Sequence, residues 1–108
     1  MQDWLARVQH DLVKRLLWPA RDRRDMGGKP GPGELLPRLI DEEGRPITAQ
    51  ALWDSLRDEC PEGPREALDA FGIALAQAVA AAEEGDLDGV LALDGAFRAL
   101  AGSLRKET

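Results

Sequence analysis

The sequence of 108 residues has the size of one domain, and its 44% apolar and 31% charged residues are typical of a folded chain rather than a disordered one. No apolar run approaches the roughly 20 residues that a membrane-spanning helix needs, so we expect no membrane span. Cys60 is the only cysteine, which excludes an internal disulfide and suits a reducing cytoplasm. The formal net charge of −6 makes nucleic acid an unfavourable partner.

Charge is divided unevenly along the chain. Residues 1–46 carry nine lysines and arginines against eight acidic residues, whereas residues 47–108 carry five against twelve. Residues 7–29 hold seven cationic residues and only three acidic ones. Positive potential is therefore concentrated in the first predicted helix and the segment that follows it.

The first predicted element is an amphipathic helix over residues 3–18. Apolar residues recur there at steps of three and four, the period of one helix face: Leu5, Val8, Leu12 and Leu16. Pro19 disfavours a helical backbone at the residue before it, so the helix is predicted to end near Trp18.

A basic loop rich in glycine and proline is predicted over residues 19–34. The stretch 19–33 holds four glycines and three prolines, which cannot sustain a regular helix or a central strand. It also holds four cations: Arg21, Arg23, Arg24 and Lys29. Three interpretations stay open, namely a solvated or internally paired connector, a site for an acidic protein, and a site for nucleic acid. Trp18 either seals the core under this loop or adds an aromatic anchor beside the arginines.

A short β-hairpin is predicted near residues 36–47, because two short apolar runs flank a polar group with Gly44 available for a turn. A second helix is predicted over residues 48–59, with Thr48 as its N-cap and one apolar face. Prolines at positions 61 and 64 separate it from the next element.

Two further helices, over residues 65–84 and 87–105, are predicted to form an antiparallel hairpin. Only the short segment 85–88 joins them, and Asp86 or Asp88 is expected to cap the second. The outer faces of this pair carry small residues where a water-exposed helix would carry charges. On the second helix these are Ala92, Gly95, Ala99 and Gly102. Either the first helix covers them or they form the interface of a homodimer.

No constellation that points to catalysis is visible. His10 is the only histidine and lies on the polar side of the first helix, so it has no second member for a triad or a metal site. Cys60 has no base near it in the sequence, and an unreactive thiol is the favoured interpretation. We therefore expect no enzyme activity, no cofactor and no metal.

The sequence thus predicts a mainly α single domain, residues 1–108, of about four helices with one short β-hairpin. The expected function is that of a non-catalytic accessory or adaptor protein of the cytoplasm that binds another protein, with an acidic surface of that partner as the expected contact. The predicted partner- or anion-binding residues are Trp18, Arg21, Arg23, Arg24 and Lys29. A small anionic ligand, bound by a carrier or an enzyme that uses the basic loop, is the first alternative. A nucleic-acid-associated regulator is the second.

Overall fold

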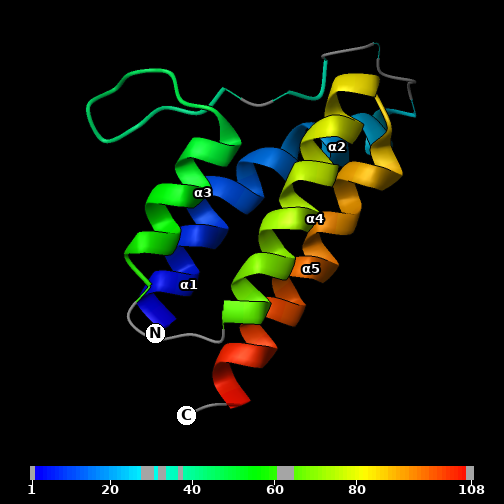
Figure 1. Cartoon of the computed structure of the whole chain (residues 1–108). Helices are drawn as coiled ribbons and strands as arrows, with labels where there is room; N and C mark the ends of the chain where they lie inside the picture. Colours follow the sequence, from blue (N-terminus) through cyan, green and yellow to red (C-terminus); the bar gives the residue numbers. More distant parts are fainter. Residues whose placement is uncertain (1, 28–30, 32–33, 37, 61–64, 107–108) are drawn as a thin grey trace.

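The computed structural model describes residues 2–27, 31, 34–36, 38–60 and 65–106, and most of these residues are helical. The first helix runs through three segments, α1 (Gln2–Val8), a π-helical turn η1 (Gln9–Val13) and α2 (Lys14–Met26). It is followed by α3 (Ala49–Asp58), α4 (Arg65–Glu84) and α5 (Leu87–Lys106). Successive helices alternate in direction, and the segment between α2 and α3 crosses one end of the bundle (Figure 1). The predicted helical class and C-terminal helical hairpin are confirmed.

The π turn keeps the apolar side of the first helix facing the core. The Lys14 N–H donates to the carbonyl of Gln9, five residues earlier. A π turn holds one residue more than an α turn, so it rotates all following residues by about 100° around the axis. Val8 before the turn and Val13, the last residue of the turn, are both buried.

The first helix does not end near Trp18, so this prediction was wrong. α2 continues through Pro19 to Met26 and ends at Gly27, whose φ of 72° is the left-handed conformation that glycine favours at a helix end. Half of the expected loop of residues 19–34 is therefore helix. A proline inside a helix costs about 3 kcal/mol relative to alanine. Packing of α2 along α5, with Ala20 fully buried, offsets that cost.

The predicted β-hairpin near residues 36–47 is also corrected, because no strand forms among the described residues of this segment. One antiparallel bridge joins Ile40 and Pro46, and the turn between them is closed by Asp41, whose Oδ1 accepts from the N–H groups of Glu43 and Arg45. A second strand has no room, since Thr48 already caps α3: its Oγ1 accepts from the Ala51 N–H at 3.1 Å.

Four aromatic side chains connect all four helices through the core. Trp4 of α1 lies 6.1 Å from Trp53 of α3, which lies 4.7 Å from Phe71 of α4, which in turn lies 6.3 Å from Phe97 of α5, each measured between ring centroids. The indole N–H of Trp4 donates to the buried carbonyl of Leu56 at 2.7 Å. The interpretation of Trp4 and Trp53 as core anchors is confirmed.

The turn between α4 and α5 forms as predicted. Gly85, with a φ of 77°, ends α4, and Asp86 caps α5 by accepting the Gly89 N–H on Oδ1 at 3.2 Å. The two helices lie close together here, because a Cβ on Gly89 would lie 2.5 Å from that of Ala81. This close contact holds the C-terminal pair together at one end.

Candidate functional site

Trp18 is the outstanding surface feature of the described chain. Its side chain is 73% exposed, although it follows two buried leucines of α2. Of the two interpretations made from the sequence, sealing the core is wrong because the ring is exposed, and the role of an aromatic anchor stays a prediction. Fully exposed tryptophans are unusual on a surface that meets only water, and tryptophan is enriched at binding hot spots.

A hollow of about 430 Å³ surrounds this side chain, and we call it the Trp18 hollow. The first helix and the segment that follows it both contribute to its lining, which consists of His10, Lys14, Arg15, Trp18, Pro19, Leu36 and Arg38. Three of these residues are permanent cations, His10 adds an imidazole, and no carboxylate is among them. The hollow is therefore an apolar floor with a positive rim.

The cations of the Trp18 hollow have no internal partner among the residues described. Lys14, Arg15 and Arg38 appear in none of the ion pairs or side-chain hydrogen bonds of that part of the chain. The hollow is thus lined by three cations that form no ion pair with another described residue.

The arginines predicted as the binding residues are placed differently. Arg21 pairs with Asp94 of α5 at 3.7 Å, and Arg23 pairs with Glu34 at 2.9 Å, so both bind within the protein. Arg24 is exposed, and Lys29 lies outside the described residues. The internally paired alternative therefore describes Arg21 and Arg23 best, while Trp18 joins a different set of cations.

The residues that sequence reasoning missed are Lys14, Arg15, Leu36 and Arg38. For Lys14 the sequence did contain a signal. Lys14 follows His10 by four residues and precedes Trp18 by four, a spacing that places all three on one side of a continuous helix. Arg38 and Leu36 carry no such periodic signal. Only the path of the chain back across α2 brings them to Trp18.

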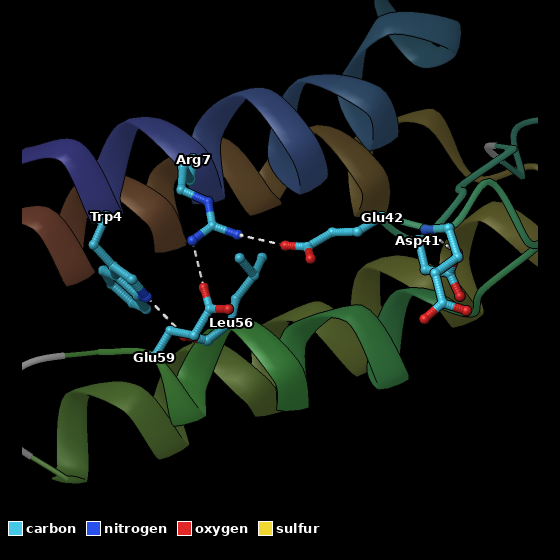
Figure 2. Close-up of polar contacts among 7 residues, drawn as sticks. Trp4, Arg7, Asp41, Glu42, Leu56 and Glu59 are labelled. Carbon is cyan, nitrogen blue, oxygen red and sulfur yellow. Dashed lines mark hydrogen bonds and ion pairs between the residues drawn. The ribbon is translucent and has the colours of Figure 1, made fainter.

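A second hollow of about 390 Å³ lies beside the first, between α1, η1, the 40–47 turn and α3, and we call it the Arg7 hollow. Figure 2 shows Arg7 bound to Glu59, the residue after α3, and to Glu42 of the turn, the latter at 3.6 Å. Its apolar floor is formed by Ile40, Ile47, Leu52 and Leu56. Four carboxylates and two arginines surround that floor, so this hollow carries the opposite charge excess: Arg7, Asp11, Arg15, Asp41, Glu42 and Glu43.

The small-residue face of α5 is left open by the rest of the described chain. Ala92, Gly95 and Ala99 are exposed and Gly102 is half-buried. A Cβ added at Gly95 or Gly102 would meet no atom within 4 Å, so neither glycine is needed for packing within one copy. Gly72 is different, because a Cβ there would lie 3.1 Å from Nε1 of Trp53. The first helix covers the opposite side of the α4–α5 pair.

Neither a metal site nor a membrane-spanning helix is found in the described part of the chain. No group of three or more histidine, cysteine, aspartate or glutamate side chains comes together there in a way that could hold a metal ion. None of its helices is long and apolar enough to cross a bilayer. His10 is exposed and makes no hydrogen bond or ion pair with another described residue.

Comparison with known proteins yields no relative: no protein-family model matches the chain, and neither the curated proteins nor the solved structures include a significant match.

Proposed function

We propose that the protein is a non-catalytic accessory protein that binds an acidic segment of another protein at the Trp18 hollow. The observation that carries the proposal is the exposed Trp18 ring among three cations without internal partners. An aromatic anchor on an apolar floor with a charged rim is the arrangement that dominates the energetics of protein interfaces. The charge excess of the rim selects acidic partners.

The shape of the hollow supports a protein partner over a small anionic ligand. Small-molecule sites enclose their ligands and cover 70–90% of the ligand surface. A hollow whose central side chain is itself 73% exposed cannot enclose a small molecule in that way. A partner that brings its own surface can cover Trp18 from outside.

Nucleic acid is supported less well than an acidic protein segment. Affinity for nucleic acid grows with the number of phosphates that the protein neutralises. The Trp18 hollow supplies three cations, and the net charge of −6 repels a polyanion over the rest of the surface.

The proposal includes a cytoplasmic location, which the lone cysteine favours, and a homodimer formed through the α5 face.

The proposal is tested with Trp18→Ala and a matched control, Met26→Ala, whose side chain is 74% exposed on the same helix but lines neither hollow. Both variants and the unaltered protein are immobilised, and proteins retained from the native host are identified and purified. We expect a partner whose dissociation constant rises about 30-fold with Trp18→Ala, the size of a hot-spot loss of about 2 kcal/mol, and stays within about twofold with Met26→Ala.

Charge variants then locate the site. Lys14→Glu combined with Arg38→Glu should weaken the complex more than Arg21→Glu combined with Arg24→Glu, because Arg21 is already paired with Asp94. A partner retained equally by Trp18→Ala and by the unaltered protein would contradict the proposal. Binding that requires a phosphorylated metabolite or a nucleic acid in place of a protein would favour one of the two alternatives.

A further inference from the structure

The two hollows adjoin, because Arg15 lines both of them. Five large apolar side chains of the described chain are exposed, and three of them lie on this one face: Trp18 and Leu36 in the Trp18 hollow, and Ile40 in the Arg7 hollow. Exposed apolar side chains gathered on one face mark a site where another surface binds. Met26 and Ile73, the other two, line neither hollow.

The charges on this face change sign along its length. The Trp18 end carries Lys14 and Arg38 without a carboxylate in its lining, whereas four carboxylates and two arginines line the other end. Of those carboxylates, Asp41 and Glu43 pair with Arg45, and Glu42 pairs with Arg7. Asp11 at that end forms no ion pair with another described residue, and the side chain of Glu42 is 88% exposed in spite of its contact with Arg7. A complementary occupant is therefore acidic at one end and basic at the other.

The length and walls of the face indicate the form of the occupant. Along the first helix it extends from Arg7 to Trp18, eleven residues apart in the sequence, which is about 16 Å at 1.5 Å per residue. The described residues offer no strand whose edge could pair with an extended peptide, only the single bridge at Ile40. In the Arg7 hollow the apolar floor lies between the first helix and α3, and such a groove is suited to an amphipathic helix.

We infer that the two hollows form one binding face, and that its occupant is an amphipathic helix of about three turns. The end of that helix on Trp18 carries acidic residues, the end on the 40–47 turn carries a basic residue, and its apolar side chains cover Trp18, Leu36 and Ile40. This inference rests on the proposed function, which requires only the Trp18 end.

The test is selection of binders from a library of random 16-residue peptides displayed on phage, using the full-length protein as the target. We expect enriched peptides with apolar residues at helical spacing, acidic residues toward one end and a basic residue toward the other. The affinity of synthetic copies is then measured by fluorescence polarisation. Trp18→Ala and Ile40→Ser should each weaken binding at least tenfold.

Matched controls are Met26→Ala and Ile73→Ser, which remove equally exposed apolar side chains outside the face and should leave affinity within twofold. Thermal unfolding verifies that each variant folds. Should Ile40→Ser unfold, the double variant Asp11→Asn with Glu42→Gln replaces it, because both side chains are exposed. This double variant should weaken the binding of peptides with a basic end at least fivefold.

The outcomes separate this inference from the proposed function. Peptides that lose affinity with Trp18→Ala but not with the variants of the Arg7 hollow would overturn the inference and leave the proposed function standing. Enriched peptides with an alternating rather than a helical apolar pattern would do the same. An absence of enriched peptides, or a peptide affinity that is unchanged by Trp18→Ala, would overturn both the inference and the proposed function.

Discussion

Replacing Gly95 and Gly102 by alanine is expected to stabilise the isolated protein. Both glycines lie inside α5, and a Cβ at either position would meet nothing within 4 Å. Glycine costs about 1 kcal/mol relative to alanine inside a helix, because the unfolded chain loses more conformational freedom. Each change should therefore add about 1 kcal/mol to the free energy of unfolding and raise the melting temperature by about 4–8 °C.

The measurement is urea unfolding followed by circular dichroism, at a protein concentration where light scattering gives a monomer. Gly89→Ala is the matched control within the same helix. Its new Cβ would lie 2.5 Å from that of Ala81, so overpacking should lower stability by about 1–3 kcal/mol. An unchanged or lower midpoint for Gly95→Ala in the monomer would refute the reasoning, since it would mean that another backbone already occupies the space beside this glycine.

Two further predictions concern the core and the open face of α5. Trp53→Ala should reduce the free energy of unfolding by about 3–5 kcal/mol, because this buried ring contacts both Trp4 and Phe71. Trp18→Ala should change that free energy by no more than about 0.5 kcal/mol, because its ring is exposed. Urea unfolding of both variants tests this contrast, and equal losses of stability would refute it. Ala99→Glu should convert the predicted homodimer to a monomer without loss of stability, since Ala99 is exposed in one copy. Light scattering over a concentration series measures the molecular mass. A monomeric mass for the unaltered protein at every concentration, together with a destabilised variant, would rule the dimer out.

Local signals in the sequence determined most of the helical framework. The apolar periods of residues 48–59, 65–84 and 87–105, together with the N-cap at Thr48 and the turn at residues 85–88, predicted α3, α4 and α5 to within about two residues. These signals are local because a cap or a left-handed glycine acts on the backbone within one turn. The same local chemistry identified Trp4 and Trp53 as core residues.

Tertiary contacts decided where the first helix ends and therefore where the site lies. Locally, Pro19 is a terminator, yet burial of Ala20 against the rest of the bundle carries the helix through it to Gly27. That extension turns Arg21 toward Asp94 and leaves Trp18 exposed beside Lys14, and the returning chain adds Leu36 and Arg38. Sequence alone placed Trp18 next to a cationic segment, and it left open whether the ring is buried or exposed. Which cations belong to it depends on long-range packing, whose free energy is not encoded in any short segment.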